Sequence, residues 1–290
     1  MRFGVFTVST PEYSLKETVE LLKRLGYDGV EWRVQSIPKE VSSDVPFELR
    51  YWGDNKSTID IEKVEEIVPE VKEMCDAAEL EIFGLTTYLR PHEFDAIEKV
   101  LRAAKHNDIK FVRVFPPDYP DPEGKKTFPQ LWKETYDNIR KLETLAKQYG
   151  VKIIFEIHHD NLIASPSAAY SFVNGCNPDY IGLIFDPGNM VYEGFENYQK
   201  SFELLGPYVA HVHVKNAILV PDKRDEFQAL KFKRDWASLR NGSADLAYLF
   251  EVLKAMEYNG TVSVEDFSND VSTEEKLADN IKYIRQLASS

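Results

Sequence analysis

Short apolar runs alternate with longer amphipathic segments along the whole 290-residue chain. Eight of the runs have the length of β-strands, and the segments between them repeat apolar residues with the spacing of an α-helix. Strict alternation of this kind predicts parallel strands joined by helical crossovers. The expected strands are Arg2–Val8, Val30–Val34, Glu81–Thr86, Phe111–Phe115, Val151–Ile157, Ile181–Phe185, Val209–Val214 and Thr261–Val264.

Each expected strand is followed by one expected helix. The first helix has the clearest start, because Ser14 and Glu17 have the spacing of a capping box. The expected helices are Leu15–Gly26, Asp60–Ala78, Glu93–His106, Gln130–Gln148, Ser165–Asn174, Tyr198–Leu205, Ala244–Met256 and Ser272–Leu287.

Eight strand–helix units predict an α/β chain folded as a single (β/α)8 TIM barrel, a fold of about 250 residues in its usual form. Several strands are almost continuously apolar, as strands buried on both faces are. The alternative is a doubly wound open sheet. That fold usually carries a glycine-rich phosphate turn after its first strand, and residues 6–11 contain no such turn. We therefore expect one barrel domain over residues 1–290.

The charge balance excludes several classes of partner. The chain has 35 Lys and Arg against 48 Asp and Glu, a net charge of −13. Nucleic acids and anionic membranes are bound by basic surfaces, so neither is expected as a partner. The N-terminus has no apolar core of a signal peptide, and no run reaches the length of a membrane span. The two cysteines, Cys75 and Cys176, are expected to be reduced thiols. We expect a cytoplasmic protein.

Two long segments follow strands at the face where barrel active sites lie. Residues 35–59 follow the second strand and residues 216–243 follow the seventh, and both are expected to be irregular. Long loops in compact domains are often lids over a site.

Polar side chains end the last four strands, and this is the strongest functional signal in the sequence. Glu156, Asp186, His213 and Glu265 stand at or near the carboxyl ends of four successive apolar strands. In a barrel those ends converge on one mouth. Buried carboxylates are costly unless they are paired or bind a metal, so we expect the four residues to hold one divalent ion. Three carboxylates and one imidazole favour Mn²⁺ or Mg²⁺, with Co²⁺ or Zn²⁺ as alternatives.

Neighbouring residues are expected to complete the site. His211 shares a face with His213 but lies one layer deeper, which favours a structural role. His158 shares the face of Glu156, whereas His159 is expected to point away. Lys215 shares the inward face of His213 and could bind a substrate oxygen or a leaving group. Three tryptophans could line the site: Trp32, Trp52 and Trp236.

The strand ends F-E-I-H, F-D-P-G-N, H-V-H-V-K-N and S-V-E-D together resemble the xylose isomerase-like (β/α)8 superfamily. The similarity is closer to its sugar isomerase and epimerase families, which include tagatose 3-epimerase, inosose dehydratase and hydroxypyruvate isomerase. The family's Glu, Asp, His and Glu ligands match the four residues above. The resemblance further implies that Glu156 and Glu265 are the acid/base pair, and that Gly29–Glu31 and Gly242–Asp245 belong to shared motifs.

This resemblance implies a metal-dependent isomerase or epimerase that acts on a ketose or related polyol through a metal-stabilised cis-enediolate. Its substrate would contact His158, Asn189, Lys215, Glu31 and Trp236. With a sugar as substrate, the three tryptophans named above could stack on its ring. The same metal site could instead support an inosose-type dehydratase. No phosphate cradle is evident, which favours a free sugar, an inositol derivative or a keto acid. The resemblance also implies a homodimer or homotetramer.

Two positions depart from the epimerase pattern. Asn189 stands where the epimerases carry His, and Leu219 stands where they carry Arg. The zinc endonucleases of the superfamily need further His and Asp ligands that this chain lacks. A different class of function stays open, namely a barrel that binds a sugar or a metal without turnover.

Overall fold

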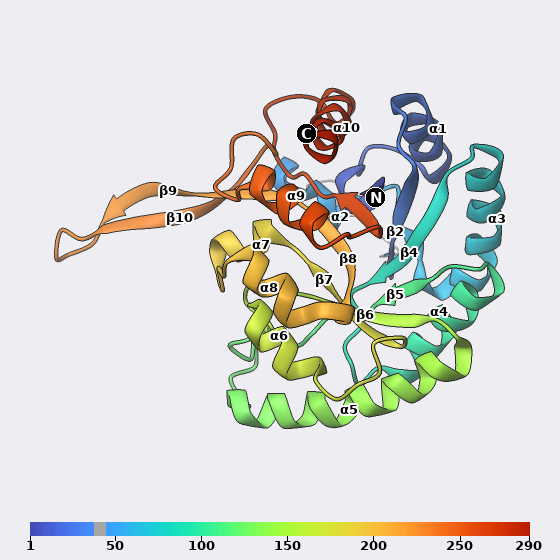
Figure 1. The fold of residues 1–290 in the computed structure, drawn as a ribbon, viewed down its shortest axis with the longest axis horizontal. Coiled ribbons are helices and arrows are strands. Elements are labelled where there is room, and N and C mark those ends of the chain that lie inside the picture. The colour runs from blue at the N-terminus through green and yellow to red at the C-terminus, as the bar shows by residue number, and fades with distance from the viewer. Residues whose placement is uncertain (38–44) are drawn as a thin grey trace.

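Eight parallel strands close into a barrel in the computed structural model, which describes residues 1–37 and 45–290. Neighbouring strands pair in the order β1-β11-β8-β7-β6-β5-β4-β2, and the pairing of β1 with β2 closes the ring (Figure 1). This confirms the predicted (β/α)8 barrel. The barrel strands are β1 (Arg2–Phe6), β2 (Gly29–Gln35), β4 (Glu81–Thr87), β5 (Phe111–Arg113), β6 (Lys152–Glu156), β7 (Ile181–Phe185), β8 (Val209–Val214) and β11 (Thr261–Val264).

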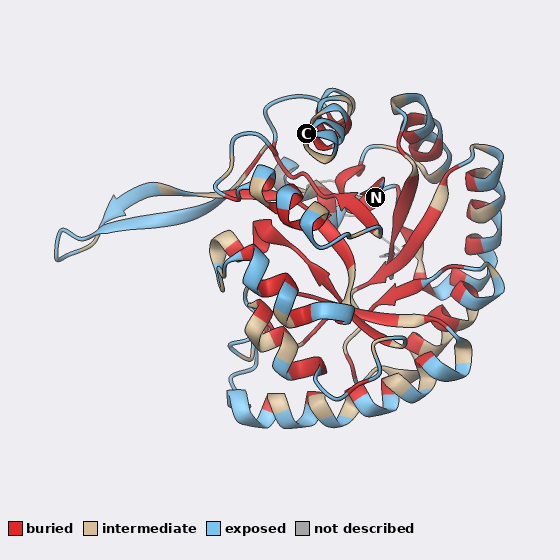
Figure 2. Cartoon of the chain, viewed as in Figure 1, coloured by how far each residue is buried: buried red, intermediate tan, exposed pale blue. Residues whose placement is uncertain are grey.

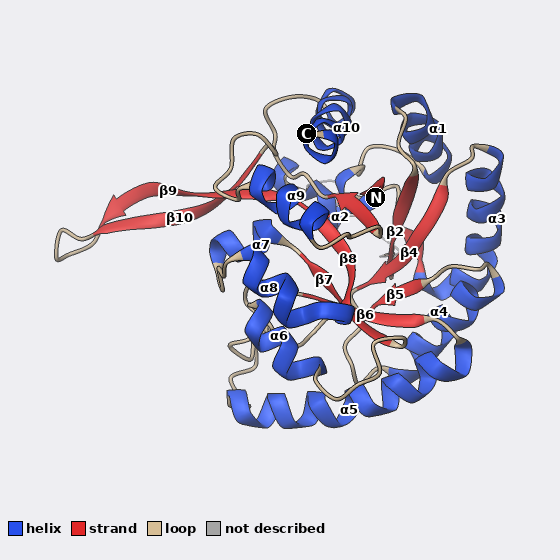
Figure 3. Cartoon of the chain, in the orientation of Figure 1, coloured by secondary structure: helices blue, strands red, loops and turns tan. Residues whose placement is uncertain are grey.

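Helices surround the barrel on its outer face (Figure 3). Within the described residues, eight helices match the predicted ones, and two short ones, α2 and α7, were not predicted. The helices are α1 (Leu15–Leu25), α2 (Arg50–Gly53), α3 (Val64–Ala77), α4 (Phe94–His106), α5 (Phe128–Tyr149), α6 (Pro166–Val173), α7 (Pro187–Tyr192), α8 (Tyr198–Leu205), α9 (Leu246–Ala255) and α10 (Thr273–Ser289). Short 3-10 turns occur at Thr7–Ser9, Phe47–Leu49, Ile61–Lys63 and Gly206–Tyr208.

The predicted capping box begins α1. The backbone N–H of Ser14 donates to Glu17 Oε2 over 2.8 Å, and the N–H of Glu17 donates to Ser14 Oγ over 3.4 Å. The helix ends at Gly26, whose φ of 81° places it in the left-handed region that glycine adopts at low cost. These local signals fix where the first crossover turns back to the barrel.

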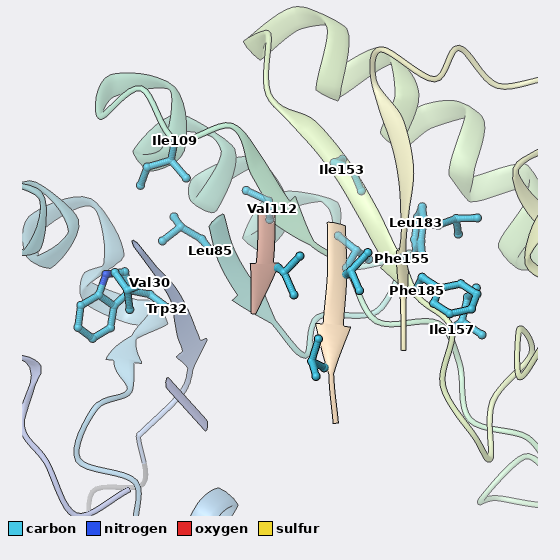
Figure 4. Packing of buried hydrophobic residues seen from close by; sticks show 14 of the residues in the cluster. Val30, Trp32, Leu85, Ile109, Val112, Ile153, Phe155, Ile157, Leu183 and Phe185 are labelled. Carbon is cyan, nitrogen blue, oxygen red and sulfur yellow. The ribbon is translucent and has the colours of Figure 1, made fainter. Parts of the chain in front are cut away.

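Most of the apolar core lies between the barrel and the helices (Figure 2). Figure 4 shows part of it, with Trp32, Leu85, Val112, Phe155 and Phe185 packed around the outside of the strands. Trp32 is fully buried there. The expectation that Trp32 could stack on a sugar is therefore wrong, because alternation along β2 turns it outward.

A second apolar cluster fills the inside of the barrel below the mouth. It consists of Phe83, Phe111, Ile154 and Ile184. Three glycines make room for its two rings: a Cβ at Gly4 or Gly29 would overlap the ring of Phe83, and a Cβ at Gly84 would overlap the ring of Phe111. The barrel floor is therefore closed by aromatic side chains, and the open space lies at the carboxyl ends of the strands.

Several expected boundaries need correction. The first strand ends at Phe6 because Thr7–Ser9 turn into a 3-10 helix. The second expected helix begins at Val64 rather than Asp60, because β3 (Ile59–Asp60) pairs with β2. Pro38, in the expected 35–59 loop, lies outside the described residues.

The segment 216–243 is not irregular. It forms an antiparallel hairpin of β9 (Asn216–Arg224) and β10 (Leu230–Ala237) that projects from the barrel (Figure 1) and is largely exposed (Figure 2). Sequence reasoning missed it because its exposed strands carry mixed charged and apolar residues rather than one buried face.

Two chain-wide expectations can also be checked. Cys75 and Cys176 are both free and buried. Within the described ranges, none of the helices is both long enough and apolar enough to cross a membrane.

We predict that Gly84→Ala lowers the free energy of unfolding by about 2 kcal/mol, because the added Cβ overlaps the ring of Phe111 in a filled interior. Urea unfolding measures the change. The same substitution in a Phe111→Leu background should cost clearly less. Equal costs in the two backgrounds would contradict this account of the barrel floor.

Candidate metal centre

The four expected ligands converge at the mouth. Glu156 is the last residue of β6, His213 lies in β8, and Asp186 and Glu265 directly follow β7 and β11. Each side chain offers one ligand atom, and these atoms all lie within 4.8 Å of one another. All four residues are buried. The strand ends thus bring together residues that are up to 109 positions apart in the sequence.

His213 directs its Nδ1 atom at the three carboxylates. This atom lies 3.4 Å from Glu156 Oε1, 3.7 Å from Asp186 Oδ2 and 3.8 Å from Glu265 Oε2. Within the described residues, His213 Nδ1 is buried and makes no hydrogen bond, whereas Asp186 Oδ2, also buried, has Lys215 Nζ 2.8 Å away. A buried polar atom without a partner calls for an explanation, and His213 Nδ1 has the geometry of a ligand that faces an ion among the carboxylates.

Glu31 orients the histidine from below. Its carboxylate accepts from His213 Nε2 over 3.0 Å, contacts His211 Nε2 at 3.0 Å and accepts from the Thr86 hydroxyl. Burial alone would raise the pKa of Glu31, but His213 and His211 hold it well below its usual value. Because His213 gives its Nε2–H to Glu31, its Nδ1 atom is left to bind a metal. The structure thus places Glu31 beneath the four ligands.

His211 lies one layer below His213, as expected from alternation. Its Nδ1 atom is 2.7 Å from Thr261 Oγ1, and its Nε2 atom is 2.9 Å from Ser263 Oγ. Burial lowers the pKa of His211 despite the neighbouring Glu31 carboxylate. Glu31, His211 and His213 form a second group with metal-ligand geometry. The hydrogen bonds of His211 satisfy both ring nitrogens, so we assign this group a supporting role.

Two residues hold the Glu156 carboxylate, one at each of its oxygens. Asn189 Nδ2 donates to Glu156 Oε1 over 3.0 Å, and the Arg113 guanidinium forms a buried ion pair with Glu156 Oε2. Burial raises the pKa of Glu156, but Arg113, His213 and Lys215 together hold it well below its usual value. Sequence reasoning missed Arg113. The available signal was a charged residue inside the apolar stretch 111–115, on the same face as Phe111.

Lys215 lies among the carboxylates rather than beside them. Its Nζ atom is 2.8 Å from Asp186 Oδ2 and 3.8 Å from Glu156 Oε1, and it forms an ion pair with Glu265. The three carboxylates raise the pKa of Lys215 above its usual value despite burial. Glu265, with Lys215 as its ion-pair partner, has a pKa raised by burial and by Glu156 and Asp186. The cluster therefore attracts positive charge.

The two histidines after β6 lie at the rim of the site. The rings of His158 and His159 stack with centroids 4.2 Å apart, and His159 Nδ1 lies 3.1 Å from Asn189 Oδ1. The expectation that His159 points away is wrong, because β6 ends at Glu156 and strand alternation does not continue beyond it. Burial lowers the pKa of His158 to about 3, so its ring is neutral.

Aromatic side chains form one wall of the mouth. Trp236 lies at the base of the β9–β10 hairpin. The centroid of its ring is 4.9 Å from the ring centroid of Tyr192, 5.1 Å from that of Phe267 and 5.4 Å from Lys215 Nζ. Trp52 lies 4.8 Å from Phe267. Of the three tryptophans considered for sugar stacking, Trp236 thus lies beside the carboxylate cluster, and Trp52 is connected to it through the ring of Phe267.

Comparison with known proteins identifies the same architecture. The family model for the xylose isomerase-like TIM barrel matches residues 19–287. Inosose dehydratase of Clostridium perfringens is 28% identical over 142 residues, which is 46% of this chain and 46% of that protein. The chain thus aligns with about half the length of such curated relatives.

Solved structures match over almost the whole chain. The 3-keto-D-glucoside 4-epimerase YcjR of E. coli has a TM-score of 0.72 at 18% identity, covering 99% of both chains. The IolI protein with a bound zinc atom has a TM-score of 0.72 at 20% identity, covering 100% of this chain and 98% of that chain. At these identities the similarity establishes the fold.

We predict that Glu31→Ala lowers the free energy of unfolding by roughly 3 kcal/mol, because two buried imidazoles and the Thr86 hydroxyl lose their shared acceptor. Chemical denaturation measures the loss. Glu251→Ala, on the exposed face of α9, is the matched control and should change stability by about 0.5 kcal/mol or less. Equal effects of the two substitutions would contradict the bridging role of Glu31.

Proposed function

Because this chain belongs to the xylose isomerase-like TIM-barrel family, we propose that it is a metal-dependent sugar isomerase or epimerase. The proposed reaction moves a proton at a carbon next to a carbonyl of a ketose or related polyol. The observation that carries the proposal is the convergence of Glu156, Asp186, His213 and Glu265 within 4.8 Å.

The four side chains fit a divalent cation. One of their ligand atoms, His213 Nδ1, is buried without a hydrogen bond, and three carboxylates supply the negative charge that such an ion neutralises. Oxygen-rich sites favour Mn²⁺ or Mg²⁺, with Co²⁺ or Zn²⁺ as alternatives. Bound there, the ion would act as a Lewis acid on the substrate carbonyl.

The two glutamates differ in how they are held, which suggests how they divide the proton transfer. Glu156 has both oxygens engaged, by Arg113 and by Asn189. Glu265 has Lys215 on Oε2, while its Oε1 makes no hydrogen bond in the described part of the chain. We assign Glu265 to proton removal from the carbon, and Glu156 to proton return on the other side. Carboxylates within hydrogen-bond reach of a carbon acid can do this.

Lys215 and the aromatic wall complete the assignment. The Lys215 ammonium, buried among the carboxylates, can stabilise negative charge on a substrate oxygen. The rings of Trp236 and Phe267 can cover the apolar face of a sugar and exclude water from the reacting carbon. Asn189 positions Glu156, and His158 and His159 line the same rim.

Dehydration is the second candidate, and the inosose dehydratase relatives favour it. The proton is removed from the same carbon, but a hydroxyl on the adjacent carbon then leaves with its bonding electrons. Lys215 would donate a proton to that hydroxyl, so that water departs. A non-catalytic barrel that binds a sugar or a metal is the third candidate. The single domain, the homodimer or homotetramer and the cytoplasmic location remain predictions.

We predict that the protein binds one divalent ion per chain and that Asp186→Asn weakens this binding roughly tenfold or more, because a charged ligand becomes neutral. Calorimetric titration with Mn²⁺ measures the affinity, and bound metal should raise the unfolding temperature. Asp245→Asn is the matched control, because Asp245 caps α9 as Asp186 caps α7. Equal metal affinity in both variants would contradict the site.

We predict that Glu265→Gln slows exchange of the substrate α-proton with solvent by about 10²- to 10⁴-fold while the fold is kept. Deuterium incorporation, measured by mass spectrometry over ketoses, inosose and small keto acids, tests this. Protein whose metal has been removed with a chelator should also lose exchange of the substrate α-proton. The products separate the candidates: an isomer or epimer keeps its mass apart from deuterium, whereas dehydration removes one water. Exchange that survives Glu265→Gln would refute the assignment.

A further inference from the structure

Two arginines are buried at the barrel mouth, on strands that carry none of the four candidate ligands. Arg33 lies in β2 and Arg113 in β5, and their exposed fractions are 3% and 2%. Each stands two residues after an inward-facing side chain, Glu31 and Phe111, so both point into the barrel. The Tyr88 ring links them: its centroid is 5.4 Å from Arg33 Cζ and 4.7 Å from Arg113 Cζ.

Arg33 has no carboxylate partner within the described residues. Its guanidinium donates to neutral acceptors: the Thr58 hydroxyl, the Gln35 side chain and, over 3.1 Å, the Trp52 carbonyl. Its Nε atom is buried and unbonded, as is Nη2 of Arg113. A buried guanidinium without a counterion is costly, and arginine is almost never fully buried unless paired. The position is therefore suited to an anion from outside the chain.

A cavity of about 130 Å³ opens beside Arg33. This volume is well above the roughly 15 Å³ that a cavity needs to hold one water molecule, so a carboxylate or phosphate group fits. Its lining includes the side chains of Gln35, Ser36, Trp52, Asn55 and Thr58 and the exposed carboxylate of Asp54.

The cavity adjoins the metal centre along two lines of contact. On one side, Arg33, Tyr88 and Arg113 lead to Glu156. On the other side, Trp52 packs against Phe267 at 4.8 Å, and Phe267 lies 5.7 Å from Lys215 Nζ. A substrate whose carbonyl end meets the carboxylates would extend along one of these lines of contact toward Arg33.

We propose that this cavity binds an anionic group of the substrate, a carboxylate or a phosphate, and that the enzyme acts on an acidic sugar rather than a neutral one. The inference rests on the proposed function and specifies its substrate class. A guanidinium matches the two oxygens of either group in a bidentate pair. In a chain of net charge −13, the buried Arg33 guanidinium, which has no carboxylate partner within the described residues, supplies the local positive charge that an anion needs in order to bind.

The test compares three ketoses that differ only at C6: D-fructose, D-fructose 6-phosphate and D-fructuronate. Calorimetric titration of the purified protein gives the affinity for each. We expect one of the acidic ketoses to bind at least about tenfold more tightly than D-fructose. Arg33→Gln should remove most of this preference, and Arg33→Lys should retain part of it. Arg102→Gln, which breaks a surface pair with Glu65, is the matched control and should keep the preference.

Thermal unfolding of each variant shows that it is folded before its affinities are compared. Tighter binding of D-fructuronate than of D-fructose 6-phosphate indicates that the substrate is a sugar acid. The reverse order indicates that it is a sugar phosphate. Equal affinity for all three ketoses, no binding of either acidic one, or a preference that survives Arg33→Gln in folded protein overturns the subsite, whatever the α-proton exchange shows. A preference that depends on Arg33 without any exchange supports the subsite and overturns the proposed reaction alone.

Discussion

Burial of negative charge inside the barrel is the constraint on which the site depends. Glu31, Glu156, Asp186 and Glu265 are all removed from water, where an uncompensated carboxylate is strongly unfavourable. Different partners stabilise each carboxylate. Glu31 contacts two imidazoles, Glu156 contacts Arg113 and Asn189, and Asp186 and Glu265 both contact Lys215. The partners come from β5, from β8 and the residue after it, and from α7, whereas the carboxylates stand in or directly after β2, β6, β7 and β11. Six of the eight barrel strands therefore contribute to keeping the carboxylates in place.

The alternation of apolar runs and amphipathic segments sufficed to predict the barrel, because strand and helix periods differ and the order never breaks. The four candidate ligands were also predictable, since residues at the ends of parallel strands must meet at one mouth. Arg113 and Arg33 were not identified, because a charged residue within an apolar strand does not reveal its partner. His159 was misplaced because alternation holds only while the strand lasts, and β6 ends at Glu156.

The hairpin and α7 were missed for another reason. Sequence periodicity detects elements with one buried face, and β9 and β10 are largely exposed along their length. The helix α7 begins at Pro187, directly after β7, and its cap is Asp186. A single carboxylate thus accepts the N–H of Asn189 and faces the other candidate ligands. Asp186 is therefore both a proposed metal ligand and the cap of α7. A pattern of apolar residues does not reveal this second role.

The contact between Glu31 and His213 joins residues 182 positions apart, and the last strand, β11, must pair with β1 before the ring is closed. Contacts of such long range form slowly, because a large loop must be closed first. During synthesis on the ribosome, the N-terminal half therefore emerges with Glu31 lacking both imidazoles. We infer that assembly of the proposed catalytic centre is among the last events of folding, and that a chain truncated before β8 lacks His213, Lys215 and Glu265 altogether.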